Sequence, residues 1–285
     1  MSVAGGSDVR PREQPRSWLS YTYANLEWGV ATILRPPRGK AIPRWRTGGR
    51  LLVGAVAVAA AIVAAMVLLD AGLAEAGRSV PGWVHLAFHE LTDFGKSGWF
   101  LWPAGLLLLA IALEGSPRLP GFSRLVLAAL AVRISFLFAA IALPSLLVTI
   151  IKRVIGRARP FVGGHLDPFL YLPPVWRPDY ASMPSGHATT AFAAAVAVAL
   201  LWPRLRLPML IYALLIAASR VVLDAHYVSD VIAGAAAGVA GALLVRDWFA
   251  ARRLGFAIGP DGRIFRLPGP SLPRLKRVAR SLVTP

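Results

Sequence analysis

Long runs of apolar residues constrain what this chain of 285 residues can fold into more than any other feature of its sequence. Residues 51–69 are mostly Ala, Val, Leu and Ile, and a helix of that length crosses roughly 30 Å of hydrocarbon. Charged residues make up 16% of the chain, against about a quarter in soluble domains. The sequence therefore predicts an all-α bundle of six transmembrane helices. The other five apolar segments are residues 99–113, 125–151, 188–202, 207–223 and 228–249.

Lysines and arginines are unevenly distributed between the two sides that six spans define. Both termini fall on one side, which holds 22 Lys and Arg against 6 acidic residues, whereas the other side holds 8 against 8. Cytoplasmic loops of membrane proteins carry such an excess of positive charge. We therefore expect cytoplasmic termini and an outer side that faces the periplasm. The same distribution explains most of the net charge of +17 without a nucleic-acid partner.

Three regions follow from this topology. We expect a basic cytoplasmic tail over residues 1–50, a six-span domain over residues 51–249 and a second basic cytoplasmic tail over residues 250–285. Aromatic and aliphatic residues between positions 18 and 33 indicate an interfacial amphipathic helix in the first tail. The Gly-, Pro- and Arg-rich second tail is predicted to be poorly ordered. The first apolar run begins too late for a signal peptide, so this span is expected to be retained.

Three polar segments at the outer ends of the predicted spans carry the candidate functional residues, since ionisable groups at membrane depth are functional candidates by default. In the first segment, Lys152 and Arg159 are seven residues apart. This spacing corresponds to two helical turns, so both side chains can point into one pocket if the helix continues until Pro160. The alternative is that both are interfacial anchors whose charged ends reach the headgroups.

The second segment opens the fourth span. Pro184, Ser185 and Gly186 predict a tight turn before a helix that begins near His187. The N-terminus of a helix offers free N–H groups and the positive end of the helix dipole, which favour a bound anion. His187 is placed to give a proton to whatever leaves that anion. An ordinary Ser N-cap is the alternative interpretation.

The third segment contains Arg220, His226 and Asp230. The last two are four residues apart, on one helical face if the helix is continuous there. A carboxylate that binds one imidazole nitrogen fixes the tautomer and leaves the other nitrogen free to attack. An ordinary His–Asp pair at a helix start is the alternative, and Asp224 is expected to be structural because it faces elsewhere.

Together the three segments read Lys-x6-Arg-Pro, Pro-Ser-Gly-His and Ser-Arg-x5-His-x3-Asp. This order resembles the three-part signature of the type 2 phosphatidic acid phosphatase family, whose superfamily includes lipid phosphatases and vanadium haloperoxidases. Chance agreement at all eleven fixed positions is on the order of one in ten million or less. The resemblance covers residues 51–249 and implies a membrane phosphatase with its pocket at the outer, periplasmic helix ends.

The resemblance also implies a role for each matching phosphate-binding residue. Lys152, Arg159 and Arg220 are expected to hold the phosphoryl oxygens. Ser185 and the backbone of Gly186 are expected to donate hydrogen bonds to the same group. Phosphoryl transfer spreads negative charge over these oxygens, so fixed cations stabilise its transition state.

The catalytic roles implied by the resemblance fall on two histidines and a carboxylate. His226 is expected to attack phosphorus and form a phosphohistidine, with Asp230 orienting its ring. His187 is expected to protonate the departing oxygen and then to act as base toward the attacking water. The outer segments lack the carboxylate cluster of a two-metal site. We therefore expect a metal-independent phosphatase without a cofactor.

A second pair of histidines, His85 and His89, lies beside Glu90 and could be imagined as zinc ligands. Their order, His-x3-His-Glu, differs from the His-Glu-x2-His of zinc hydrolases. We expect an outer amphipathic helix there instead. Cysteine is absent, which excludes disulfides, thiolate metal sites and a cysteine nucleophile.

A pocket at the ends of membrane spans is accessible to a lipid headgroup in the outer leaflet. Phosphatidic acid, phosphatidylglycerol phosphate, a polyprenyl diphosphate and the lipid A phosphates all fit, and neither the substrate nor the oligomeric state is specified by the residues. A non-enzymatic transporter or scaffold is the alternative, disfavoured because only Arg133 lies well inside a span. A vanadate-dependent haloperoxidase is disfavoured because those relatives are soluble. The Ala-, Arg- and Leu-rich chain suggests a high-GC bacterium and hence its inner membrane.

Overall fold

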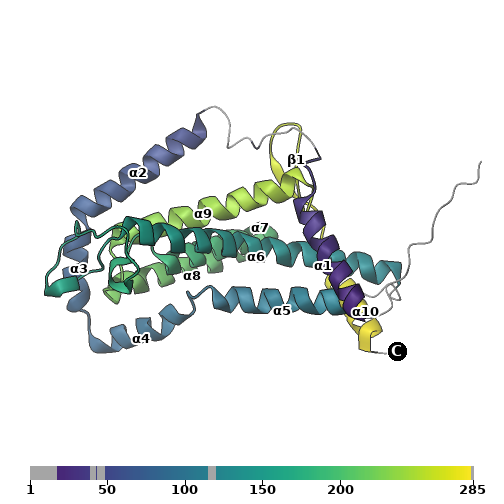
Figure 1. Cartoon of the computed structure of the whole chain (residues 1–285), viewed down its shortest axis with the longest axis horizontal. Helices are drawn as coiled ribbons and strands as arrows, with labels where there is room; N and C mark the ends of the chain where they lie inside the picture. Colours follow the sequence, from purple (N-terminus) through teal and green to yellow (C-terminus); the bar gives the residue numbers. More distant parts are fainter. Residues whose placement is uncertain (1–17, 39–42, 44–48, 115–119, 284–285) are drawn as a thin grey trace, which may run out of the picture.

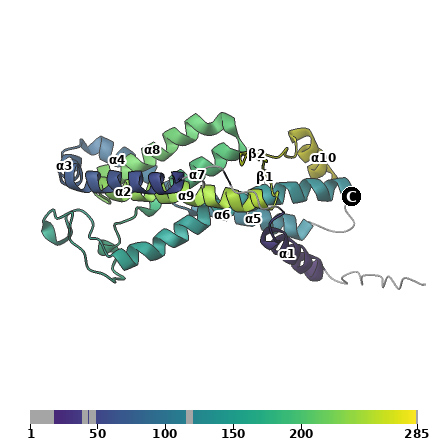
Figure 2. The ribbon, with the colours of Figure 1, turned by 90° about the horizontal axis from the view of Figure 1, so that it is seen from above.

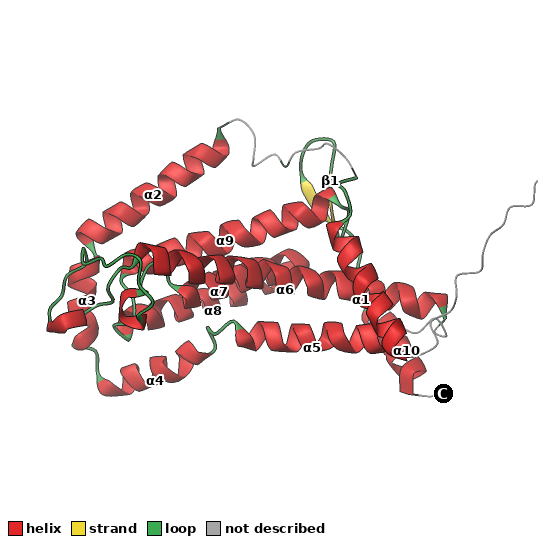
Figure 3. Cartoon of the chain, in the orientation of Figure 1, coloured by secondary structure: helices red, strands yellow, loops and turns green. Residues whose placement is uncertain are grey.

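Long helices that run side by side form the body of the molecule (Figure 1). The computed structural model describes residues 18–38, 43, 49–114 and 120–283. Within these ranges the α-helices are α1 (Trp18–Leu34), α2 (Arg50–Leu68), α3 (Asp70–Arg78), α4 (Gly82–Asp93), α5 (Gly98–Glu114), α6 (Gly121–Ile155), α7 (Gly186–Leu201), α8 (Arg206–Val222), α9 (Val228–Ala251) and α10 (Leu272–Val283). Three 3₁₀ turns, η2 (Val162–Gly164), η3 (Pro178–Tyr180) and η4 (Pro203–Leu205), and an antiparallel hairpin of β1 (Phe256–Ile258) and β2 (Ile264–Arg266) complete the described part (Figure 3).

All six predicted spans form helices, namely α2, α5, α6, α7, α8 and α9. Five helical segments are long and apolar enough to cross a membrane, and one of them runs through α4 and α5. Helix α7 is apolar too but has only 16 residues. The prediction of an all-α, multi-pass membrane bundle is therefore confirmed, with five clear spans and a shorter sixth apolar helix.

Helix α7 lies at the centre of the bundle, in contact with α6, α8 and α9, and the view from above shows α8 and the end of α6 on opposite sides of it (Figure 2). Its packing against α9 depends on small residues. A Cβ atom at Gly238 would lie 2.3 Å from the carbonyl oxygen of Thr189, and one at Gly234 would lie 2.3 Å from that of Ser185. Small residues allow membrane helices to approach this closely. The N-terminus of α7 is consequently seated directly on the N-terminal turns of α9.

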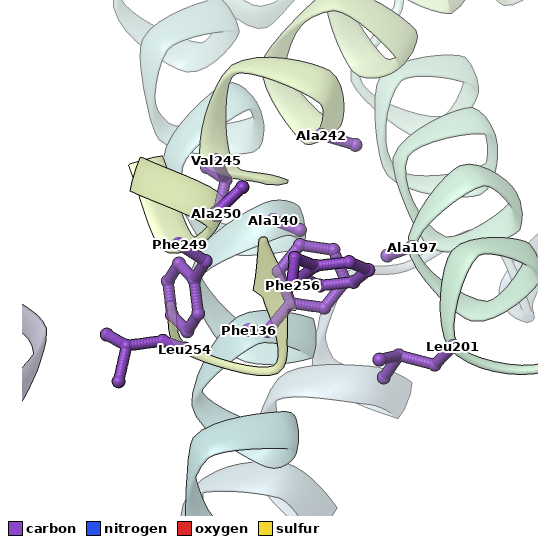
Figure 4. Packing of buried hydrophobic residues seen from close by; sticks show 10 residues of the cluster. All are labelled: Phe136, Ala140, Ala197, Leu201, Ala242, Val245, Phe249, Ala250, Leu254 and Phe256. Atoms are coloured by element: carbon purple, nitrogen blue, oxygen red, sulfur yellow. The ribbon is translucent and has the colours of Figure 1, made fainter. Parts of the chain in front are cut away.

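The C-terminal tail is ordered, so the expectation of poor order was wrong. Phe256 of β1 is buried and packs edge-to-face on Phe136 of α6, with 4.8 Å between the ring centroids (Figure 4). Val278 of α10 is buried in a cluster with Val126 and Leu127 of α6. Burial of these apolar side chains against α6 compensates for the ordering of a Gly- and Pro-rich segment.

Arg133, the charged residue inside the third span, also binds the C-terminal tail. Its guanidinium donates hydrogen bonds to the carbonyl oxygens of Leu267 (3.0 Å) and Pro268 (2.8 Å), and to that of Ala129 in its own helix (2.7 Å). Arg133 is half-buried, and a charge that has partly left water is tolerated where carbonyl groups satisfy it. Arg133 therefore has a structural partner and needs no transport role.

The two ends of the bundle differ in what they hold. The C-termini of α6 and α8 and the N-termini of α7 and α9 meet at one end, beside α3 and α4 (Figure 1). Helices α1 and α10 and the hairpin lie at the opposite end. Helix α1 of the first tail and the described part of the second tail are thus at one end, and the three polar segments are at the other, as the six-span topology predicts. The predicted helix of the first tail is α1; residues 1–17, 39–42 and 44–48 of that tail lie outside the described residues.

Candidate active site

The first polar segment leaves the helix earlier than expected. Helix α6 ends before Gly156, whose left-handed φ of 62° suits glycine, and a Cβ there would lie 2.4 Å from the carbonyl oxygen of Leu172. The chain then runs extended, and the N–H of Arg159 donates to the carbonyl oxygen of Asp179 at 2.8 Å. The expectation of a helix continuing to Pro160 was therefore wrong. Arg159 is positioned by this backbone hydrogen bond between two loop segments, and not by helical spacing from Lys152.

The three predicted phosphate-binding cations nevertheless come together. Lys152, in the last turn of α6, interacts electrostatically with Arg159, and Arg159 does so with Arg220 in the last turn of α8. Burial lowers the pKa of Arg159 although Asp179 and Asp230 oppose the shift. Gathering cations in a partly buried place costs free energy unless an anion is bound there. The arrangement therefore fits an anion site.

Ser185 occupies the N-cap position of α7 but does not act as an ordinary cap. Its side chain makes no capping hydrogen bond, while its backbone N–H donates to the carbonyl oxygen of Asp230 at 2.9 Å. Gly186 and His187 then form the first turn of α7. His187 lies within electrostatic range of Arg220 and His226. The second and third polar segments thus meet at this helix start, where N–H groups favour an anion.

His226 lies in the turn between α8 and α9, so the helix is not continuous from His226 to Asp230 as the four-residue spacing would require. The two side chains still meet, with 3.7 Å between His226 Nδ1 and Asp230 Oδ2, which is too long for a hydrogen bond. Ser182 lies between them: its hydroxyl donates to Asp230 Oδ2 at 2.6 Å and is 3.5 Å from Nδ1. Nδ1 therefore faces Ser182 and Asp230, which leaves Nε2 on the opposite edge of the ring.

The protonation state of His226 favours attack on an electrophile. The side chain is 4% exposed. Burial lowers the pKa of His226 below its ordinary value of 6.5, although Asp230 pulls it the other way. A neutral imidazole at neutral pH has a lone pair available for nucleophilic attack.

A fully buried ion-pair network behind Asp230 was missed by sequence reasoning. Arg157 Nη1 donates to Asp230 Oδ1 at 2.6 Å, and Arg157 Nη2 donates to Asp70 Oδ2 at 2.8 Å. Asp70 in turn accepts a hydrogen bond from the N–H of Ser229 at 3.0 Å. Arg157 is two residues from Arg159, and Asp70 directly follows the apolar run of residues 51–69 and opens α3. An acidic residue without an assigned role at the end of a span was the available signal.

Several buried polar atoms around this site have no hydrogen-bond partner among the described residues. They include Arg159 Nε, Arg220 Nε, Ser185 Oγ and His187 Nε2, one or more from each polar segment. Buried polar groups are normally hydrogen-bonded. The unpartnered donors are consistent with a phosphate-sized anion that contacts all three segments.

Histidines outside this site are exposed. His85 and His89 lie on α4, so a helix does form there, and His165 lies in the loop after η2. Within the ranges that the structure describes, no group of three or more His, Asp or Glu side chains could hold a metal ion.

The chain is similar in sequence to a known family and to two curated proteins. The family model of the PAP2 superfamily matches residues 133–254. A lipid A 1-phosphatase of Rhizobium johnstonii is 36% identical over 213 residues, covering 72% of this chain and 86% of the relative. A lipid A 1-phosphatase of Rhizobium etli is 34% identical over 221 residues, covering 77% and 91%.

A solved structure is also similar in part. The first transmembrane PAP2 type phosphatidylglycerolphosphate phosphatase from Bacillus subtilis aligns with 79% of this chain and 94% of its own. The sequence identity is 18% and the TM-score is 0.42. The two Rhizobium relatives are therefore the informative matches.

Proposed function

The chain belongs to the PAP2 superfamily and is a multi-pass membrane phosphatase that acts on a lipid, and we propose that its substrate is lipid A, from which it removes the 1-phosphate. The observation that carries this proposal is the similarity to two lipid A 1-phosphatases over most of their length, at 36% and 34% identity. Lipid A was one of four lipid classes that the sequence left open. The similarity favours it over phosphatidic acid, phosphatidylglycerol phosphate and polyprenyl diphosphates.

In the proposed reaction, His226 Nε2 attacks phosphorus and forms a P–N bond while the bond from phosphorus to the sugar oxygen breaks. His187 gives its proton to that oxygen. Water then attacks the phosphohistidine, His187 accepts a proton from the water, and the P–N bond breaks to release inorganic phosphate. Asp230 would orient the ring of His226 through Ser182, whose hydroxyl bonds Asp230 Oδ2 and lies 3.5 Å from Nδ1, and so keep Nε2 directed at the substrate.

The transferred phosphoryl group is proposed to lie among Lys152, Arg159 and Arg220. Ser185 Oγ and the backbone N–H of Gly186 would donate to the same oxygens. Support comes from the position of Arg159, which is near enough to influence both Lys152 and Arg220 electrostatically, and from the unpartnered Arg159 Nε, Arg220 Nε and Ser185 Oγ. These fixed donors supply the charge stabilisation on which phosphoryl transfer depends.

The site is proposed to face the periplasm from the bacterial inner membrane, with the tails in the cytoplasm. The excess of Lys and Arg at the end opposite the site supports this orientation. Since the chain has no cysteine, the reactivity of a single introduced cysteine can show on which side of the membrane a position lies. A cysteine replacing the exposed Trp176 should react with a membrane-impermeant maleimide in spheroplasts, and one replacing Arg277 should react only after lysis. The reverse pattern would contradict the orientation.

The substrate is tested by incubating the purified protein with each of the four lipid classes and measuring phosphate release. Mass spectrometry of the lipid A product identifies which phosphate was lost. We expect loss of the 1-phosphate by the wild type and none by His226→Asn, a variant of similar size. Hydrolysis of another class with lipid A untouched would refute the proposed substrate while leaving a lipid phosphatase.

A further inference from the structure

The end of α4 and the turn that links it to α5 reach the candidate active site, although they belong to none of the three polar segments. Thr92, in the last turn of α4, is 7% exposed. Its hydroxyl accepts a hydrogen bond from Arg220 Nη1 at 2.6 Å and lies 3.0 Å from the hydroxyl of Ser219. The contact to Arg220 is short and charge-assisted, which makes it stronger than a neutral hydrogen bond.

The same turn contacts the second polar segment. A Cβ atom at Gly95 would lie 2.9 Å from His187 Cδ2 and 2.7 Å from Ile216 Cγ2, so the backbone of the turn is packed on the imidazole ring. The hydroxyl of Tyr212 on α8 donates to the carbonyl oxygen of Phe94 at 2.9 Å, which fastens the turn to α8. The segment from Thr92 to Gly95 therefore contacts both Arg220 and His187.

We propose that Thr92 is a positioning residue of the phosphate site: its hydroxyl fixes the orientation of the Arg220 guanidinium. A guanidinium carries five N–H donors in a rigid, planar fork. Once Nη1 is bound to Thr92, rotation of that fork is restricted, and Nε is left buried without a partner in the described part of the chain. A preset fork loses less entropy when it binds phosphate. The proposal rests on the phosphate-binding role of Arg220 in the proposed function.

A purely structural role of Thr92 makes a different prediction. Val has the shape of Thr but lacks the hydroxyl, so a side chain needed only for packing would tolerate this change. The hydrogen bond to Arg220 would not survive it. Ser restores the hydroxyl without the methyl group and should restore the function of a positioning residue.

The test is a calorimetric titration of the purified full-length protein with orthovanadate, which mimics the transferred phosphoryl group and requires no turnover. Loss of a hydrogen bond to a charged group predicts about ten-fold weaker vanadate binding by Thr92→Val. Binding by Thr92→Ser should lie within about three-fold of the wild type. The matched control is Thr149→Val, at an exposed position where the hydroxyl bonds the carbonyl oxygen of Ser145 in the same helix, at 2.8 Å.

Equal vanadate affinity of Thr92→Val and the wild type would overturn the positioning role and leave the proposed function intact. If Thr92→Val fails to fold, Thr92→Ala takes its place; misfolding of both would assign the hydroxyl to folding and would also overturn the role. A failure of the proposed function has a separate signature, because the wild type would then bind vanadate yet release no phosphate from lipid A. Wild-type protein that binds no vanadate would refute the phosphate site itself.

Discussion

Replacing Arg157 with Gln should destabilise the protein strongly and should stop turnover, although Arg157 is not expected to touch the substrate. The side chains of Arg157, Asp70 and Asp230 are all 0% exposed. Arg157 donates to both carboxylates, to the hydroxyl of Ser229 at 2.7 Å and to the carbonyl oxygen of Pro168 through Nε and Nη2. The variant would leave two buried carboxylates without their cation.

The magnitude follows from that burial. Removing one partner of a buried ion pair costs about 3–5 kcal/mol, because the remaining charge stays in a medium of low dielectric constant. Burial lowers the pKa of Arg157, but Asp230 and Asp70 outweigh it and raise the pKa, so this guanidinium stays charged. By contrast, the pair of Arg177 with Asp179 is exposed and 3.7 Å long. Arg177→Gln should cost at most about 1 kcal/mol.

The assay is unfolding in mixed micelles with increasing SDS, followed by tryptophan fluorescence, for the wild type and both Arg→Gln variants. Asp70→Asn and the double variant with Arg157→Gln complete a mutant cycle. We expect Asp70 and Arg157 to be coupled by more than about 1 kcal/mol. Additive free energies, or equal stabilities of Arg157→Gln and Arg177→Gln, would refute the reasoning.

Three further predictions concern pH, helix packing and metals. Because burial lowers the pKa of His226 and attack needs its neutral form, kcat/KM should be retained at pH 6.5 and fall only at lower pH; an acid limb above pH 6.5 would contradict this. Gly238→Ala should destabilise the bundle by about 1–3 kcal/mol in the SDS assay because its Cβ would collide with α7. Gly54→Ala, which has open space around it, should not destabilise it. Incubation with EDTA should leave turnover largely intact, and activity lost to EDTA and restored by magnesium would show a metal requirement.

The helices of this fold could be predicted because a membrane span is encoded locally. Each apolar run must form all of its backbone hydrogen bonds within itself, so composition and length decide the element without tertiary contacts. The C-terminal tail illustrates the opposite case. Phe256 and Val278 are ordered by distant residues of α6, and their local composition of Gly, Pro and Arg gave the wrong expectation.

The candidate site could be predicted from the residue types at fixed spacings, but not from helical geometry. Gly156 after a long apolar run is a common helix C-terminal signal, and it would have placed the helix end correctly. The pairing of Arg157 with Asp70 is different in kind, because it joins positions 87 residues apart. Nothing in a local pattern links such residues. Asp70 at the start of α3 and Arg157 in the loop after α6 meet in three dimensions, where both bond Ser229 at the start of α9.

We propose that residues from three distant segments form one phosphate site in which His226 is the nucleophile. The most direct measurement is rapid quenching of the protein during turnover of labelled lipid A, followed by mass spectrometry of its peptides under conditions that preserve phosphohistidine. We expect phosphate on His226 in the wild type and on no residue in His226→Asn. Phosphate on His187 or a serine, or turnover by His226→Asn, would contradict it.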